Sequence, residues 1–147
     1  MYQNILVPTD GSKLSMKAVK TAVRLASALG ARVTGVYCIP TFSDPIYTEG
    51  LSVAGPSAGR QRAEAKKAGS KALAEIEKSA RAAGVACGSA ILASGTPWEG
   101  ILKTAKSRRS DLIVMASHGR RGISALLLGS ETVKVLTHST IPVLVYR

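Results

Sequence analysis

Five short apolar runs that alternate with helix-like segments constrain the fold of this chain more than any other feature of its sequence. Such alternation is typical of βαβ units, which pack helices against a parallel sheet. The runs that we predict to be strands span residues 5–7, 32–39, 85–93, 111–116 and 141–146. The sequence therefore predicts an α/β fold, an open doubly wound parallel sheet of five strands with helices on both faces.

The segments between these runs predict four main helices. The first follows Ser12 and ends at Gly30, because glycine commonly terminates a helix. At the start of the third, Thr96 as N-cap, Pro97 as first helical residue and Glu99 match a capping box. The other three predicted helices span residues 60–83, 97–108 and 130–137.

The length and composition of the chain suit a single domain. It has 147 residues and shows no internal repeat. Aromatic residues make up only 4% of it, so the core must be built from Ala, Val, Leu and Ile. Residues 40–59 carry three prolines and three glycines. They predict a long irregular segment, which in a compact domain is usually a binding lid or disordered.

The charge of the chain favours anionic partners. It has 20 Lys and Arg against 9 Asp and Glu, a formal net charge of +11, and such an excess attracts nucleotides, nucleic acids and acidic membranes. The basic residues are spread along the sequence, so we interpret most of them as solvated helix faces. The scarcity of aromatics argues against single-strand recognition, and we do not expect a nucleic acid partner.

The sequence indicates neither a membrane protein nor a secreted one. No run approaches the ~20 apolar residues of a membrane span, and residues 1–7 lack the long apolar region of a signal peptide. Cys38 and Cys87 lie in apolar runs without metal-ligand spacing, so we interpret both as reduced, small core residues. We therefore expect a cytoplasmic protein.

Two stretches place polar residues and glycines directly after a predicted strand, at residues 8–12 and 117–130. In doubly wound sheets, ligands bind at the carboxyl edge where the winding direction reverses. The spacing of the elements leaves the strand orders 3-2-1-4-5 and 2-1-3-4-5 both open. In the first order, the two stretches face each other.

The second stretch has the composition of a phosphate-binding segment. Gly119 and Gly129 allow close backbone approach, and the N–H groups that begin the next helix point toward an anion. Ser130 adds a hydroxyl donor, while Arg120 and Arg121 add positive potential. Neither the P-loop nor the dinucleotide fingerprint is present, so those two nucleotide-binding families are disfavoured.

Several motifs along the chain match those of one known family. They are residues 5–12 (Ile-Leu-Val-Pro-Thr-Asp-Gly-Ser), 111–115 and 142–145, and a pair of glycines with nine residues between them that is followed by Ser130. On these motifs the chain resembles the universal stress protein family, in its UspA-like, ATP-binding subgroup, over essentially its whole length. The family's ATP signature begins with a glycine where this chain has Ala116, which adds one methyl group.

The resemblance implies one universal stress protein domain over residues 1–147, with a Rossmann-like, adenine nucleotide alpha hydrolase-like sheet in the order 3-2-1-4-5. It implies that the chain binds ATP, which Mg²⁺ would accompany. Asp10 would contact the ribose or adenine side, and Cys38 would lie at the adenine. The remaining implied contacts shape the pocket, line the ribose and phosphate path or hold phosphate: Pro8, Thr9, Met115, Ala116, Gly119, Arg120, Arg121, Gly129, Ser130 and Glu131. Among these Glu131 is unexpected, because a carboxylate repels phosphate unless it faces solvent or a metal.

We therefore expect an ATP-binding stress-response regulator that acts as a nucleotide-dependent switch and is not a dedicated enzyme. No catalytic residue is assigned, and His118 is interpreted as ordering its loop. A slow ATP hydrolase or nucleotidyl transferase and a basic nucleic-acid-binding module are the alternatives.

The resemblance also implies a homodimer that pairs the last strands of two copies. The final apolar run, residues 141–146, agrees with this because an edge strand exposes unpaired backbone groups.

Overall fold

The computed structural model of the chain describes residues 1–39, 41, 58–119 and 127–147. Most of the irregular segment expected at residues 40–59 therefore lies outside the described residues. The same holds for Arg120 and Arg121.

Five parallel strands form one sheet in the order β3-β2-β1-β4-β5. Their bounds are β1 Asn4–Pro8, β2 Arg32–Ile39, β3 Cys87–Ala93, β4 Leu112–Ala116 and β5 Val143–Tyr146. The central strand β1 pairs with β2 on one side and with β4 on the other, so that Ile5 lies opposite both Val33 and Leu112. Of the two orders that the spacing left open, the one that makes β1 and β4 neighbours is confirmed.

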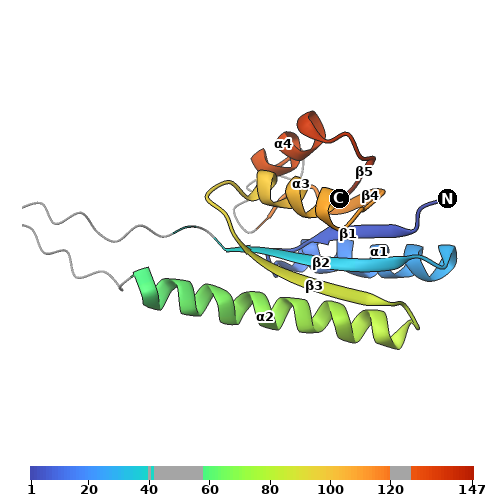
Figure 1. The fold of residues 1–147 in the computed structure, drawn as a ribbon, viewed down its shortest axis with the longest axis horizontal. Coiled ribbons are helices and arrows are strands. Elements are labelled where there is room, and N and C mark those ends of the chain that lie inside the picture. The colour runs from blue at the N-terminus through green and yellow to red at the C-terminus, as the bar shows by residue number, and fades with distance from the viewer. Residues whose placement is uncertain (40, 42–57, 120–126) are drawn as a thin grey trace, which may run out of the picture.

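Two helices cover each face of the sheet. Helices α1 (Lys13–Leu29) and α2 (Ala58–Ala82) share one core cluster, and α3 (Pro97–Ser107) and α4 (Ser130–His138) share the other. Figure 1 shows α2 and the α3–α4 pair on opposite sides of the strands. Within β1, Ile5 and Val7 face the α1–α2 side while Leu6 faces the α3–α4 side. Because alternate residues point to opposite faces, burial of both faces requires continuous apolar strands.

Small residues let the helices lie close to the sheet, and Tyr37 and Met115 join the Ala, Val, Leu and Ile residues that the sequence assigned to the core. A Cβ added at Gly69 of α2 would lie 2.7 Å from the ring of Tyr37, and one added at Gly35 of β2 would lie 2.9 Å from Ile76 Cδ1. The larger partner in each pair occupies the volume that the glycine leaves free. A close-packed interior is reached in this way with few large side chains.

The predicted capping box at the start of α3 is wrong. Thr96 is the N-cap residue, but its side chain makes no capping hydrogen bond. The N–H of Thr96 donates to Ser94 Oγ at 3.3 Å. In a capping box, the Glu99 carboxylate would accept this N–H. The N–H of Trp98 donates instead to Glu131 Oε2 at 2.9 Å. A residue from α4 thus satisfies one of the free N–H groups at the start of α3.

Strands β3 and β5 each begin two residues later than the sequence predicts, because the residues before them form other hydrogen bonds. The apolar pattern places Val85 at the start of the third strand, but its N–H donates to Ala80 O and continues the end of α2. The pattern also places Ile141 in the last strand, but its N–H donates to Ser139 Oγ in a local turn. Within the described ranges, no helix is both long and apolar enough to cross a membrane.

Candidate functional site

The carboxyl ends of β1 and β4 lie side by side at the centre of the sheet. After β1 the chain enters α1 on one face, and after β4 it leads toward α4 on the other. This is the reversal of winding at which open α/β sheets bind their ligands. Both stretches singled out from the sequence begin at this edge.

The turn after β1 is held by a set of short hydrogen bonds. The N–H of Thr9 donates to Val36 O at 2.9 Å, and its hydroxyl accepts the N–H of Gly11 at 3.1 Å. Asp10 Oδ1 accepts the N–H of Ser12 at 2.9 Å, while Ser12 Oγ caps α1 by accepting the N–H of Ser15 at 3.2 Å. These bonds fix the Asp10 carboxylate at the head of α1.

Asp10 and Gly119 meet across the edge of the sheet. A Cβ added at Gly119 would lie 2.5 Å from Asp10 Oδ2, a distance that Cβ atoms essentially never show. Glycine at 119 therefore allows the segment after β4 to approach the Asp10 carboxylate. The juxtaposition of the two stretches that the sequence predicted is present in the structure.

The start of α4 is fastened directly to the end of β4. The N–H of Gly129 donates to Ser117 O at 2.7 Å, and Thr132 Oγ1 donates to Ala116 O at 3.0 Å. A Cβ at Gly129 would lie 3.2 Å from the Cα of His118, so this approach too is close. The amide of Gly129 is thus used within the protein.

The amides at the start of α4 are those of Ser130, Glu131 and Thr132. The first bond of the helix ladder is the one from Val133 N–H to Gly129 O, at 3.0 Å, so these three amides have no partner within the helix. The positive end of the helix dipole lies there as well. An anion at this edge would be attracted both by these three N–H groups and by the helix dipole.

Thr132 was not singled out from the sequence. It is buried, with 3% of its surface exposed, and its bond to Ala116 O sets where α4 begins. Its position in the first turn of the predicted helix could have indicated this role, because a hydroxyl there can form a hydrogen bond with a residue outside the helix.

Ala116, which replaces the first glycine of the signature, fits its position without strain. It is the last residue of β4 and is buried. In the described part of the chain, Arg109 is the one non-glycine residue with positive φ. Extended backbone at position 116 does not require glycine.

The Glu131 carboxylate caps α3. Besides accepting the Trp98 N–H, it lies 3.4 Å from Lys134 Nζ. The carboxylate that would be repulsive in a phosphate site is therefore engaged with a backbone donor and a cation.

Cys38 lies near the carboxyl end of β2 and packs against the α3–α4 side of the core. Its Sγ is 3.7 Å from Pro97 O. Burial, and secondarily the negative charge of Glu131, raise the pKa of the thiol to about 11. The raised pKa keeps the Cys38 thiol protonated, so it is not an activated nucleophile.

His118 and Trp98 make local contacts. His118 Nδ1 lies 3.1 Å from Ser117 Oγ, which agrees with its interpretation as a residue that orders the loop. Trp98 packs against the core and stacks on His138 of α4, with ring centroids 4.6 Å apart. Within the described residues, no three His, Cys, Asp or Glu side chains gather as metal ligands would.

Among the predicted site residues, Pro8, Thr9 and Asp10 follow or end β1, Met115 and Ala116 end β4, and Gly129, Ser130 and Glu131 begin α4. Gly119 meets Asp10, and Cys38 stands at the end of the neighbouring strand β2. Only Arg120 and Arg121 lie outside the described residues.

The similarity of this chain to known proteins extends over its whole length. The model of the Universal stress protein family matches residues 1–147. Universal stress protein MJ0531 of Methanocaldococcus jannaschii is 33% identical over 150 residues, which cover 100% of this chain and 83% of that protein.

Two solved structures share the fold. The structure of protein MJ0577, from the same organism, superposes with a TM-score of 0.81 at 26% identity and covers 99% of this chain and 96% of that one. A universal stress protein in complex with cAMP superposes with a TM-score of 0.72 at 27% identity, covering 99% of this chain and 97% of that one. The sheet order and the helices on both faces are those of the adenine nucleotide alpha hydrolase-like fold.

Proposed function

This chain belongs to the universal stress protein family, and from that premise we propose that it is an ATP-binding regulator that acts as a nucleotide-dependent switch in a stress response. The observation that carries the proposal is the approach of Asp10 to Gly119 across the switch point of the sheet. That approach brings a carboxylate suited to ribose hydroxyls next to a glycine-bounded segment suited to phosphates.

The nucleotide would lie along the carboxyl edge from β2 to α4. Asp10 contacts the ribose or adenine side, with Pro8 and Thr9 shaping the pocket and Cys38 as a wall at the adenine. Met115, Ala116 and Gly119 line the path to the phosphates. Ser130 and the first amides of α4 hold the phosphates, together with Arg120, Arg121 and the backbone of Glu131, and Gly129 lets the phosphates approach the backbone closely.

The choice of ligand has two supports. One solved relative, 27% identical, binds cAMP, which favours an adenine nucleotide. The spacing of Gly119, Gly129 and Ser130 matches the family's ATP signature, which favours the triphosphate. Mg²⁺ in such sites is commonly held by one or two carboxylates and the phosphates themselves. We assign no residue of this chain as a metal ligand, since Asp10 is placed at the ribose or adenine side.

The contacts of α4 suggest how binding could act as a switch. Its first turn would contact the phosphates, while Glu131 in the same turn caps α3. A ligand that binds one arrangement of α4 better than another shifts the population of both helices. The surface that α3 and α4 offer to a protein partner would change with it.

The assembly that we propose is a homodimer of one-domain chains in the cytoplasm. Strand β5 is at the edge of the sheet. Leu144 of β5 and Leu136 and Val133 of α4 are 37%, 40% and 45% exposed. A second copy would cover these apolar side chains by pairing its own β5 with this one.

Equilibrium dialysis against labelled ATP tests the nucleotide site. The double variant Gly119→Ala/Ser130→Ala should abolish ATP retention while the far-UV circular dichroism spectrum stays unchanged. The new methyl group at 119 displaces the Asp10 carboxylate, and a hydroxyl donor at the start of α4 is lost.

The matched control is Gly88→Ala/Ser70→Ala. The nearest atom to a Cβ at Gly88 is 4.0 Å away, and Ser70 is exposed on α2. This control should retain ATP like the wild type. Wild-type protein that retains no ATP, or a Gly119/Ser130 variant that retains it fully, would overturn the proposed site.

A further inference from the structure

The positive charge of the chain gathers on one of its two helix layers. Helices α1 and α2 carry 11 of the 20 basic residues and 3 of the 9 acidic ones, a net charge of +8 out of +11. Helices α3 and α4 together carry 3 basic and 2 acidic residues. Basic residues that are dispersed in the sequence thus become concentrated on one side of the sheet.

Helix α1 carries its cations in a single row. Lys13, Lys17, Lys20 and Arg24 are four, three and four residues apart, which places them on one face of a helix. All four are exposed and lie opposite the buried residues of α1, which are Ser15, Ala18, Val19, Ala22, Val23 and Ala26. None of the four makes an ion pair with a described residue.

This row does not serve the stability of α1. The helix contains no acidic residue, and its first turn begins with Lys13. Like charges three or four residues apart weaken a helix, and cations near the N-terminus oppose its dipole. A partner with negative charge would relieve both effects.

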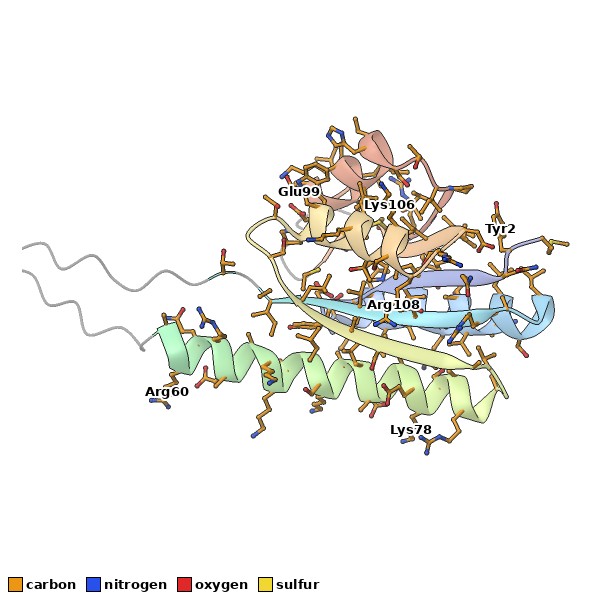
Figure 2. The ribbon with its side chains drawn as sticks, viewed as in Figure 1. Tyr2, Arg60, Lys78, Glu99, Lys106 and Arg108 are labelled. Carbon is orange, nitrogen blue, oxygen red and sulfur yellow. The ribbon has the colours of Figure 1, made fainter. Side chains whose placement is uncertain are left out.

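Helix α2 carries a second row. Lys67, Lys71 and Lys78 are exposed on the face opposite to its buried residues, and Arg60 continues the row toward the N-terminus. The exposed Glu64 and Glu75 lie in the same row, so that its cations outnumber its carboxylates by four to two. Figure 2 shows Arg60 and Lys78 pointing away from the sheet. Arg60 pairs with Glu64 at 3.3 Å, while the three lysines make no ion pair with a described residue.

The two rows lie side by side. Both helices follow parallel strands on the same face, so they run in the same direction, and Ser27 Oγ of α1 donates to Ala83 O just past α2 at 3.4 Å. The rows from Lys13 to Arg24 and from Lys67 to Lys78 are each about 16 Å long. Packed helix axes lie about 8 to 10 Å apart. Together they form a cationic face, defined by Lys13, Lys17, Lys20, Arg24, Lys67, Lys71 and Lys78.

Contrary to the expectation from the sequence, we infer that this cationic face binds the phosphate backbone of a double-stranded nucleic acid without reading its sequence. The exposed large hydrophobic residues of the described ranges are Met1, Tyr2, Leu127, Val133, Leu136 and Leu144, all outside α1 and α2. The cationic face therefore has no anchor for a lipid bilayer, no apolar centre for a protein interface and no aromatic platform for unstacked bases. A duplex backbone needs only cations.

Fluorescence anisotropy with a labelled DNA duplex of random sequence tests the inference. The triple variant Lys17→Gln/Lys20→Gln/Arg24→Gln should weaken binding. It should also flatten the plot of log K against log salt between about 50 and 200 mM, by about 0.9 for each phosphate that the protein no longer neutralises. Circular dichroism checks that the variant is folded.

The control Lys103→Gln/Lys106→Gln/Arg108→Gln removes the same charge from α3 and the turn after it. It should bind the duplex like the wild type. Equal weakening by both variants would show that only net charge matters and would overturn the inference.

Two competing partners are tested with the same proteins. Binding to phosphatidylserine vesicles without binding to the duplex would overturn the inference in favour of a membrane. Displacement of the duplex by excess ATP would also overturn it, because the duplex would then occupy the nucleotide site. Retention of the duplex in excess ATP supports a separate surface, whatever the outcome of the dialysis.

Discussion

At the scale of single residues, the buried position of Cys38 lowers the reactivity of its thiol. Its pKa is raised to about 11 from 9.0, first by burial and second by the carboxylate of Glu131. The thiolate is the nucleophilic form of cysteine, so the folded protein keeps this side chain unreactive at neutral pH.

The raised pKa of Cys38 predicts a pH dependence of stability. The neutral thiol is favoured in the folded state, so its contribution is complete below pH 9 and is lost as pH rises toward about 11. Urea unfolding across that range should show a smaller decline in the free energy of unfolding for Cys38→Ala than for the wild type. Equal declines in both proteins would contradict the assignment.

The pairing of Asp10 with Gly119 was predictable only with the family resemblance. Both residues follow strands whose carboxyl ends share an edge of the sheet, but it was the resemblance that selected the order in which β1 and β4 are neighbours. The partner of Glu131 was not predictable. Its bond to Trp98 joins residues 33 positions apart on two helices, and local patterns carry no information on such contacts. The role of Thr132 was not predictable for the same reason, because its hydroxyl donates to the carbonyl oxygen of Ala116 in another element, β4.

At the scale of elements, α3 depends on α4 for its N-terminal cap. Substituting a residue that caps a helix typically costs about 1 kcal/mol. We expect Glu131→Ala to lower the free energy of unfolding by about this amount, since the Trp98 amide then loses its acceptor. Urea unfolding followed by circular dichroism measures the change.

The matched control for this cap is Glu99→Ala, which removes the same charge from an exposed position in the first turn of α3. Its effect on the urea midpoint should be smaller. If Glu99→Ala destabilised the protein as much as Glu131→Ala, the effect would arise from charge at the helix start and not from the hydrogen bond.

The hydrophobic periodicity of the sequence predicted which segments are helices and which are strands. It did not predict where they end, because the ends depend on individual hydrogen bonds. Gly30 ends α1 with φ of 67°, as the sequence indicates. The late start of β5 depends on Ser139, whose hydroxyl also donates to Ile141 O at 2.6 Å. A serine that forms a local turn competes with strand extension.

At the scale of the whole molecule, β5 at the edge of the sheet is where we propose that a second copy binds. Ile113 and Ser117 donate their N–H groups to Pro142 O and Tyr146 O, so the backbone groups of even-numbered residues in β5 face β4. Those of Val143 and Val145 face outward, since the direction alternates along a strand. These outward groups are what a second copy would pair with.

We expect Val145→Pro to prevent dimerisation, because proline removes an outward N–H group and disfavours continued pairing. Val145→Ala keeps that N–H and should leave the dimer intact. Sedimentation equilibrium should give twice the chain mass of 15.3 kDa for the wild type and Val145→Ala, and the single mass for Val145→Pro. Wild-type protein that sediments as a monomer at high concentration would count against pairing through β5.

The position of Trp98 gives the protein a built-in optical reporter. It is the one tryptophan of the chain, its amide is bonded to the residue that follows Ser130, and its ring stacks on the last residue of α4. Any displacement of that helix alters the surroundings of the indole. Intrinsic emission can therefore follow events at the head of α4 in unlabelled protein.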